Sequence, residues 1–289
     1  MIPAQASRTA LRVALHRAAH QLLDVPTVFV DPLAVRILGP RAEAAFRADP
    51  AQYDTTRFAP QMRAFMAVRA RFAEEQIEQA RAAGVRQVVI LGAGLDTYAY
   101  RSPAAPPVTI WEVDHPATQA WKRELLAAAG IEAPAHLKFV AADLACEPLE
   151  GALAAADFEA HAGAVFSWLG VTQYLKPDDV FATLRYVAGV TAAAGGITFD
   201  YSITPQLLSL TERWAYNALA ARVSAVGEPW LSHFVPAELV SALANCGFAV
   251  AYDLDPQELL QRLVAGDANQ PRLGRLARLM WAGAARYAA

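Results

Sequence analysis

The chain has 289 residues, of which 55% are hydrophobic and 18% are charged, and its formal net charge is −3. This length allows one large domain with a buried core, and this composition is typical of a globular protein rather than a disordered one. The small negative charge argues against nucleic-acid binding, which usually requires a clustered basic face.

The N-terminal residues 1–83 are predicted to form a helical cap. Residues 7–23, 31–48 and about 60–83 have helical patterns; the stretch DVPTVFVDP separates the first two, and the third ends before Gly84. Basic residues interrupt the first segment, and no apolar run in the chain reaches the roughly 18 residues that span a bilayer. We therefore expect neither a secretory signal nor a membrane span.

An arginine lies beside the apolar stripe of the third helical segment. The stripe contains Met62, Met66, Ala73, Ile77 and Ala80. At about 100° per residue, Arg69 falls within about 60° of its centre. Burial of an unpaired guanidinium costs several kcal/mol. Arg69 is therefore expected either to pair with a core carboxylate or to bind a carboxylate of the cofactor. Arg63, at the edge of the stripe, is a weaker second candidate.

From residue 84 onward, strands and helices alternate. Strands are expected at 86–91, 108–113, 136–141, 163–168 and 196–202, and helices at 116–129 and 177–192. This order is typical of an α/β fold with a mostly parallel, doubly wound sheet and helices on both faces. We interpret residues 84–204 as the cofactor-binding core, with the ligand beyond the carboxyl ends of the strands.

The first of these strands runs into a glycine turn, in VVILGAGLDTYAYR. The residues expected to approach a cofactor are Gly92, Ala93, Gly94 and Asp96. A dinucleotide fingerprint requires a third glycine, but Thr97 stands in its place. Three prolines follow soon after: Pro103, Pro106 and Pro107. They leave little room for a long helix that would hold a pyrophosphate, which weakens the assignment of a nicotinamide dinucleotide.

Acidic residues stand at the ends of the next two strands. Glu112 and Asp114 lie about 20 residues beyond the glycines, where an acid that binds a ribose is expected. Asp114 could alternatively only cap the helix that follows. Asp143 could accept a hydrogen bond from an adenine amino group while Leu144 packs on the ring, or it could only cap its loop. A ligand with a ribose, an adenine and a cationic end suits this set, and S-adenosylmethionine is such a ligand.

Together these motifs resemble those of the bacterial branch of the leucine carboxyl methyltransferase-like family. Members of this family are class I S-adenosylmethionine-dependent methyltransferases. The matching stretches are RTALRVALHRAAHQLLDVPTVFVDPLAVRILG, QVVILGAGLDTYAYR, WEVDHPATQAWKRELL, FVAADLA, GVTQYL and ITFDYS. The resemblance implies a Rossmann-like, seven-stranded sheet with an N-terminal helical cap. It also implies cofactor binding through Arg69, Gly92, Asp114, Asp143 and Leu144.

Two positions depart from the family pattern. Tyr98 replaces the first arginine of the frequent GLDTRAYR motif. Leu169 occupies the position of the acid in the frequent EGLLMYL motif. If that acid normally holds the ammonium group of the cofactor, this protein must use another acid or the backbone near Phe166–Trp168. Trp168 is therefore included among the candidate cofactor contacts.

Residues 205–235 are too irregular for another crossover and are interpreted as a lid inserted over the site. A helix at 236–246, a strand at 248–254 and a segment at 276–287, which could be a helix or a strand, complete the single domain through residue 289. Candidate acceptor contacts, which could alternatively be core residues, are Tyr174, Tyr201, Trp214, Tyr216, Trp230 and His233.

The implied reaction is in-line methyl transfer to an oxygen atom. A carboxylate acceptor is already ionised and needs no general base, whereas a hydroxyl needs one. His233 is the first candidate for a base and His115 the second, although His233 could be an ordinary polar residue of the lid. A small or medium organic acceptor is expected in preference to a protein C-terminus.

Two other functions stay open at this point: a nicotinamide-dependent oxidoreductase and a protein that binds S-adenosylmethionine without turnover. The remaining histidines have no metal-ligand spacing, so no metal site is expected. Cys146 and Cys246 lie far apart without a CxxC partner. This cysteine usage fits a reducing, cytoplasmic location.

Overall fold

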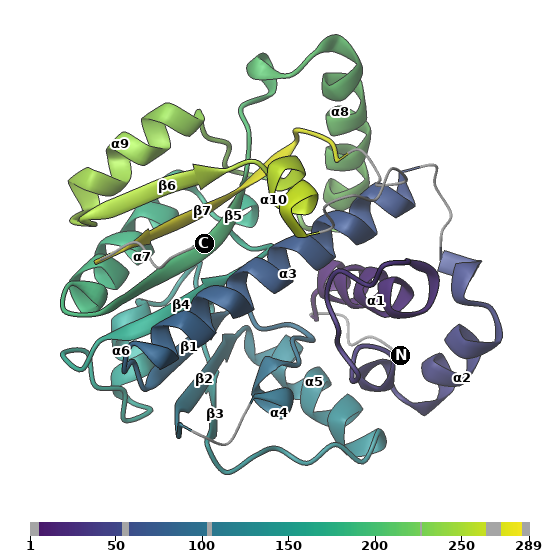
Figure 1. The fold of residues 1–289 in the computed structure, drawn as a ribbon, viewed down its shortest axis with the longest axis horizontal. Coiled ribbons are helices and arrows are strands. Elements are labelled where there is room, and N and C mark those ends of the chain that lie inside the picture. Colours follow the sequence, from purple (N-terminus) through teal and green to yellow (C-terminus); the bar gives the residue numbers. More distant parts are fainter. Residues whose placement is uncertain (1–5, 54–57, 103–105, 226, 264–272, 285–289) are drawn as a thin grey trace.

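A seven-stranded sheet forms the centre of the molecule (Figure 1). The computed structural model describes residues 6–53, 58–102, 106–225, 227–263 and 273–284. Helices cover both faces of the sheet, which confirms the predicted doubly wound α/β fold. None of the described helices has the length and apolar character needed to cross a membrane.

The strands occur in the order expected along the chain. They are β1 (Gln87–Leu91), β2 (Thr109–Asp114), β3 (Leu137–Ala141), β4 (Ala164–Trp168), β5 (Gly195–Ser202), β6 (Val250–Leu254) and β7 (Ala277–Gly283). Their spatial order is β3-β2-β1-β4-β5-β7-β6, and among them β7 alone runs antiparallel to its neighbours. The chain order reverses between β1 and β4, and α/β proteins bind ligands beside such a switch point.

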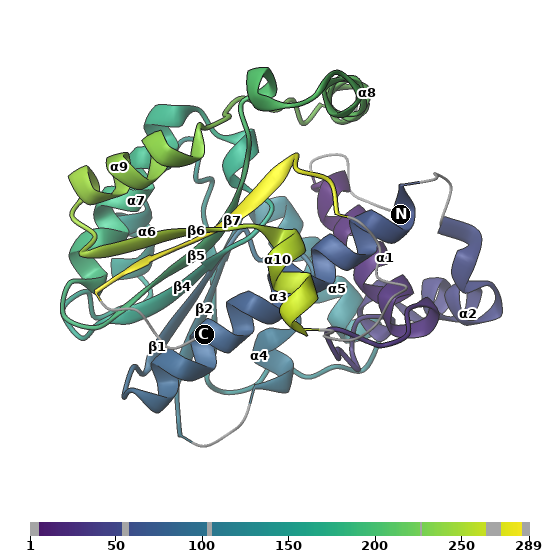
Figure 2. The ribbon, with the colours of Figure 1, turned by 45° about the horizontal axis from the view of Figure 1, so that its top comes forward.

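Two layers of helices enclose the sheet (Figure 2). One face is covered by α6 (Leu149–Ala154), α7 (Pro177–Thr191) and α9 (Pro236–Cys246). The other is covered by α3 (Ala59–Ala82), α4 (Tyr98–Arg101) and α10 (Pro256–Leu263). The central strands are buried on both faces, which explains why their sequences read as nearly continuous apolar runs.

The N-terminal helices join this core through a third apolar cluster. It combines α1 (Arg8–Leu23), α2 (Pro40–Ala48) and α5 (Pro116–Ala128). The prediction of one helix over 31–48 is wrong, because a short 3-10 helix (Arg36–Leu38) precedes α2. Gly39 separates the two at φ +88°, a conformation that a helix cannot continue, and Pro40 begins the new helix.

The segment 205–235 is more regular than predicted. It contains α8 (Leu210–Ser224), a helix that stands apart from the sheet (Figures 1 and 2). Ser209 and Glu212 form a capping box at its start, and this S-x-x-E signature was available in the sequence. The segment left open at 276–287 contains β7; its residues beyond 284 lie outside the described part of the chain.

Candidate functional site

A cavity of about 470 Å³ lies at the carboxyl ends of the parallel strands. We call one wall the floor; it consists of strand ends and the turns after them, at residues 90–96, 114–115, 142–145, 167 and 169–171. We call another wall the roof; it consists of residues 7, 9, 10, 13, 14 and 17 with residues 227–229 and 231. Helix α3 contributes Met66, Arg69 and Ala70 between them.

The glycine turn after β1 leaves no room for side chains. Gly92 has a φ of +62° and Gly94 a φ of +48°. A Cβ on Gly92 would lie 2.3 Å from Cγ2 of Val171, in the turn after β4. A Cβ on Gly94 would lie 3.2 Å from Cβ of Ala10, in α1. The turn, which includes the lining residues Ala93 and Asp96, is therefore packed tightly against the rest of the floor at Val171 and against the roof at Ala10.

Asp114, at the end of β2, is hydrogen-bonded into the same turn. Its two carboxylate oxygens accept from the N–H of Gly94 at 2.5 Å and from the N–H of His115 at 2.7 Å. Burial raises the pKa of the Asp114 carboxyl more than these two donors lower it. The N-cap of α5 is His115, whose Nδ1 accepts from the N–H of Ala117, so Asp114 is not the helix cap considered above.

Asp143 and Leu144 line the cavity from the turn after β3. The Oδ1 atom of Asp143 accepts from the N–H of Ala145 at 3.0 Å. The loop-capping role considered for Asp143 is therefore present, and its side chain also borders the cavity. The two interpretations are compatible.

Arg69 extends from α3 to the cavity and is 5% exposed. Its Nη1 atom donates to Oδ2 of Asp200, on β5, at 2.5 Å. Arg69 thus pairs with a core carboxylate and borders the cavity at the same time. Arg63 instead pairs with Asp24, at 2.8 Å between Nη2 and Oδ1, and is absent from the cavity lining.

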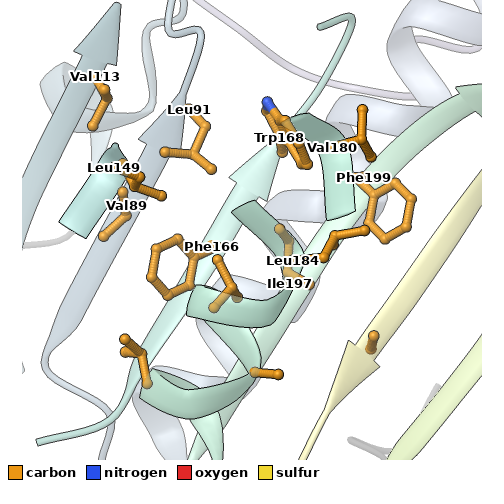
Figure 3. Close-up of a cluster of buried hydrophobic side chains, with 14 of the residues drawn as sticks. Val89, Leu91, Val113, Leu149, Phe166, Trp168, Val180, Leu184, Ile197 and Phe199 are labelled. Atoms are coloured by element: carbon orange, nitrogen blue, oxygen red, sulfur yellow. The ribbon is translucent and has the colours of Figure 1, made fainter. Parts of the chain in front are cut away.

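Glu112 and Trp168, also predicted as cofactor contacts, are absent from the cavity lining. Glu112 pairs with Lys122 of α5 at 2.6 Å, and burial raises the pKa of Glu112 to about 7 even though Lys122 opposes that shift. Trp168 packs in the core beside Phe199 (Figure 3). Successive side chains of a strand face opposite sides of the sheet. Because Ser167 borders the cavity, the side chain of Trp168 faces away from it.

Among the candidate acceptor contacts, Tyr174 lines the cavity. Tyr201 lies elsewhere: its hydroxyl donates to Oδ1 of Asp253, on β6, at 2.6 Å. Trp214 is 64% exposed on α8 and also lies outside the lining.

The other three candidates, Tyr216, Trp230 and His233, are absent from the cavity lining. Their aromatic rings pack together beside α8. Tyr216 contacts both Trp230 and His233. The Nε2 atom of His233 is hydrogen-bonded to the Tyr216 hydroxyl, and burial lowers the pKa of His233. The first candidate for a base is therefore separate from the cavity, whereas the second, His115, lines it.

One carboxylate connects the two parts of the roof. Glu228 accepts hydrogen bonds from the N–H of Arg8 and the N–H of Thr9, each at 3.1 Å, and from the Thr9 hydroxyl. The N–H of Ser7 donates to Oγ1 of Thr118, on α5, at 3.1 Å. These contacts hold the first turn of α1 over the cavity. Sequence reasoning missed the roof because no local pattern links residues 219 to 220 positions apart.

A buried group of charges joins α1 to the glycine turn. Arg17 pairs with Asp31 and donates to Oγ1 of Thr97 at 2.9 Å. Arg101 pairs with Asp31 at 3.1 Å and with Glu74 at 2.5 Å. Burial raises the pKa of Glu74 to about 7 although Arg101 opposes that shift. In Asp31, by contrast, burial is opposed by the two arginines together with the hydrogen bonds from Thr97 and Leu33, and the pKa of the carboxyl is lowered.

The two departures from the family pattern differ in their relation to the cavity. Tyr98 is buried away from it, and its hydroxyl donates to Oε1 of Glu78 at 2.6 Å. Leu169 borders the cavity, so an apolar side chain replaces an acid in the wall. An acid nevertheless contacts this turn, because Oδ1 of Asp200 accepts from the N–H of Gly170 at 2.5 Å.

The described residues contain no cluster of histidine, cysteine and acidic side chains that could hold a metal ion. Cys146 and Cys246 are free thiols. The cavity instead offers backbone groups at the glycine turn, carboxylates at two strand ends and a guanidinium from α3. Such a set can bind a ligand that combines hydroxyl or amino donors with an anionic group.

The family model described as leucine carboxyl methyltransferase matches residues 10–188. The chain is 27% identical over 275 residues to "Putative S-adenosyl-L-methionine-dependent methyltransferase YktD" of Bacillus subtilis strain 168, covering 88% of this chain and 90% of that protein. It is 32% identical over 224 residues to a "Putative S-adenosyl-L-methionine-dependent methyltransferase" of Mycobacterium sp. strain KMS, covering 73% of this chain and 71% of that protein.

Two crystal structures share the fold over nearly their whole length. A "putative methyltransferase" from Thermobifida fusca YX has a TM-score of 0.55 and 18% identity, covering 94% of this chain and 93% of that one. A DUF574 family protein from Streptomyces avermitilis MA-4680 has a TM-score of 0.53 and 15% identity, covering 98% and 99%. At these identities the likeness concerns the arrangement of the sheet and its helices.

Proposed function

The chain belongs to the leucine carboxyl methyltransferase family, and from this premise we propose that it transfers a methyl group from S-adenosylmethionine to an oxygen of a small or medium organic acceptor. The oxygen is that of a carboxylate or a hydroxyl. The names of the relatives support the cofactor and the methyl transfer. One observation carries the site assignment: the glycine turn, Asp114, Asp143 and Arg69 border the same cavity.

The chemistry of this donor set fits S-adenosylmethionine. The Asp114 carboxylate can accept from ribose hydroxyls, and the Asp143 carboxylate can accept from the adenine amino group while Leu144 packs on the ring. Arg69 can pair with the carboxylate of the amino-acid end. A cavity of about 470 Å³ lies within the range of roughly 300–1,000 Å³ typical of small-molecule sites.

S-adenosylmethionine supplies a methyl group that its sulfonium has already activated. The residues of the chain therefore need mainly to orient the acceptor oxygen about 3 Å from that methyl, and such positioning contributes on the order of 7–11 kcal/mol. Met66, Tyr174 and Leu231 line the cavity and can exclude water around the acceptor. Among these three, the Tyr174 hydroxyl can hydrogen-bond to the acceptor oxygen.

Within this proposal, a carboxylate acceptor is favoured over a hydroxyl. A carboxylate is ionised at neutral pH and needs no general base. His233, the first candidate for a base, is bonded to Tyr216 and is absent from the cavity lining. His115 lines the cavity, but its Nδ1 already accepts from the N–H of Ala117.

A small acceptor is favoured over a protein C-terminus. The first turn of α1 and the residues after α8 are tied across the cavity by Glu228. A folded protein would need this roof to separate before its C-terminus reached the floor, whereas a small molecule needs only a gap between side chains.

Calorimetric titration with S-adenosylmethionine and with NADH tests the cofactor. Binding of the first compound without the second is expected, and the opposite pattern would indicate an oxidoreductase. Incubation with methyl-labelled cofactor and a panel of carboxylic acids, phenols and short peptides tests the acceptor. Transfer to a carboxylic acid is expected; cofactor binding without transfer to any acceptor would indicate a binding protein.

A further inference from the structure

A carboxylate behind the cavity wall joins two elements that border the cavity. Asp200 lies in β5, is 3% exposed and is absent from the lining. Its Oδ2 atom accepts from Nη1 of Arg69, on α3, at 2.5 Å. Its Oδ1 atom accepts from the N–H of Gly170, in the turn after β4, at 2.5 Å. One side chain therefore fixes both the guanidinium and this turn.

Gly170 also packs closely against the guanidinium of Arg69. Gly170 has a φ of +73°, and a Cβ built on it would lie 3.1 Å from Nη2 of Arg69. The hydroxyl of Thr172 donates to the backbone oxygen of Asp200 at 2.7 Å, which adds a second bond between this segment and β5. The guanidinium is therefore restricted on the side of the sheet. It also lies over the Phe65 ring, 5.6 Å from its centroid, and Arg69 borders the cavity.

Stability alone is a weak reason for this pair. A buried ion pair seldom adds net stability relative to apolar residues of similar volume, because removing two charges from water is costly. A buried arginine that borders a binding cavity does, however, need a counterion while the ligand is absent. Asp200 supplies that counterion and leaves other N–H donors of Arg69 for a ligand.

The charge of the pair also suits the ligand. The amino-acid end of S-adenosylmethionine is a zwitterion with one carboxylate and one ammonium group. A lone guanidinium would attract the first and repel the second, whereas Arg69 and Asp200 together are neutral and polar. Leu169 supplies no charge in this part of the wall, so the negative charge at this turn comes from Asp200.

We propose that Asp200 is a positioning residue: it orients Arg69 and the turn at Gly170 so that they receive the amino-acid end of S-adenosylmethionine. This inference rests on the proposed function, because it presumes that the cavity binds this cofactor. It adds a residue that does not border the cavity and that acts only through its two partners.

Calorimetric titration of Asp200→Asn with two ligands tests the proposal. S-adenosylmethionine carries the amino-acid end, whereas 5′-methylthioadenosine keeps the nucleoside and lacks that end. We expect the variant to bind S-adenosylmethionine about 10- to 100-fold more weakly, the usual range for losing a hydrogen bond to a charged group. We expect its affinity for 5′-methylthioadenosine to change less than twofold.

The matched control is Asp253→Asn. Asp253 also accepts from an arginine within the sheet, at 2.6 Å from Nε of Arg278, but lies away from the cavity. This variant should lose stability comparably and bind both ligands as the wild type does. Gly170→Ala provides a second perturbation, because its Cβ presses on Arg69 without altering Asp200, and it should reproduce the selective loss even if Asp200→Asn does not fold.

The outcomes separate the two proposals. Equal weakening of both ligands in Asp200→Asn and Gly170→Ala, or no weakening of either, would overturn the positioning role. A wild-type protein that binds neither ligand would overturn the proposed function itself.

Discussion

The floor and the roof of the cavity are built by different means. The floor is made of strand ends that parallel pairing brings to one edge, so Gly94 and Asp114 meet although they are 20 residues apart. The roof is made of α1 and the segment after α8, which meet through the side chain of Glu228 across 219 to 220 positions. The backbone thus sets the floor, whereas individual side chains hold the roof in place.

This difference separates two tasks. Binding of the nucleoside requires fixed donors and acceptors, which strand ends provide because their backbone is buried and hydrogen-bonded. Access to the cavity requires a wall that can move. The segment after α8 is tied to the first turn of α1 by side-chain bonds of Glu228, and opening these bonds costs less than moving α1 out of its apolar cluster. We therefore expect changes in the floor to alter affinity, and changes in the roof to alter stability and exchange of the ligand.

The largest effect is expected where the roof joins the floor. Replacing Arg17 with Met leaves Asp31, which is 1% exposed, with Arg101 as its only remaining cationic partner among the described residues. Breaking a buried pair typically costs about 3–5 kcal/mol, and we expect a loss near 3 kcal/mol in the free energy of unfolding. Urea denaturation measures it. Arg12→Met, on the exposed face of the same helix, is the control, and equal losses in both variants would contradict the role of this pair.

The next effect is a pH dependence at the same junction. The pKa of Glu74 is about 7 in the folded protein, well above the value of about 4.3 for an unperturbed glutamate. Between these values the folded state keeps a proton that the unfolded state loses, so stability falls as the pH rises. Glu74→Gln removes this pH-dependent contribution to the free energy of unfolding.

Urea denaturation of the wild type and of Glu74→Gln at several pH values between 5 and 8 measures this contribution of Glu74 to stability. The wild type should lose up to about 3 kcal/mol relative to the variant over this interval, because one pKa unit corresponds to about 1.4 kcal/mol. Glu75→Gln, at a half-buried position of α3 where the side chain pairs with Arg71, is the control and should run parallel to the wild type. Parallel curves for wild type and Glu74→Gln would contradict the assigned pKa.

A change in the floor should affect binding with little effect on stability. Asp143→Ala removes a carboxylate that borders the cavity, and we expect binding of S-adenosylmethionine to weaken by roughly 1–3 kcal/mol. Titration calorimetry measures the loss. Asp157→Ala, at a side chain that is 90% exposed, is the control. An unchanged affinity in Asp143→Ala would remove this residue from the binding site.

A change in the roof should have the smallest effect. Glu228→Ala removes an acceptor of two N–H groups in the first turn of α1, while the N-cap Ser7 is kept; losing such hydrogen bonds typically costs about 0.5–1.5 kcal/mol each. Because a loosened roof eases both entry and exit, stopped-flow measurements should show faster association and faster dissociation of S-adenosylmethionine. Glu238→Ala, in the exposed first turn of α9, should change neither rate. Faster dissociation alone would indicate that Glu228 contacts the ligand directly.

The same contrast explains what could be predicted from the sequence. The strand pattern and the glycine turn located the floor, because period and turn chemistry are local properties. The absence of Glu112 and Trp168 from the lining could not be predicted, because their side chains depend on partners outside their own segments. These partners are Lys122 for the first and the core around Phe199 for the second. A shift of one residue along a strand places a side chain on the opposite face of the sheet, and the sequence pattern alone does not fix which face it takes.

The roof could not be predicted in this way. Nothing in the sequence near Arg8 and Thr9 indicates that Glu228 will accept their hydrogen bonds, since that contact exists only after the chain has folded. The capping box of Ser209 and Glu212 is, by contrast, a local signal that marks the start of α8. Asp200 was likewise hidden, because its role depends on α3 crossing β5.

A crystal structure with S-adenosylhomocysteine bound tests the central claim most directly. It should place the ribose at Asp114, the adenine beside Asp143 and Leu144, and the amino-acid carboxylate at Arg69. A nucleoside bound outside this cavity, or bound within it with these side chains turned away, would contradict the assignment of the floor as the cofactor site.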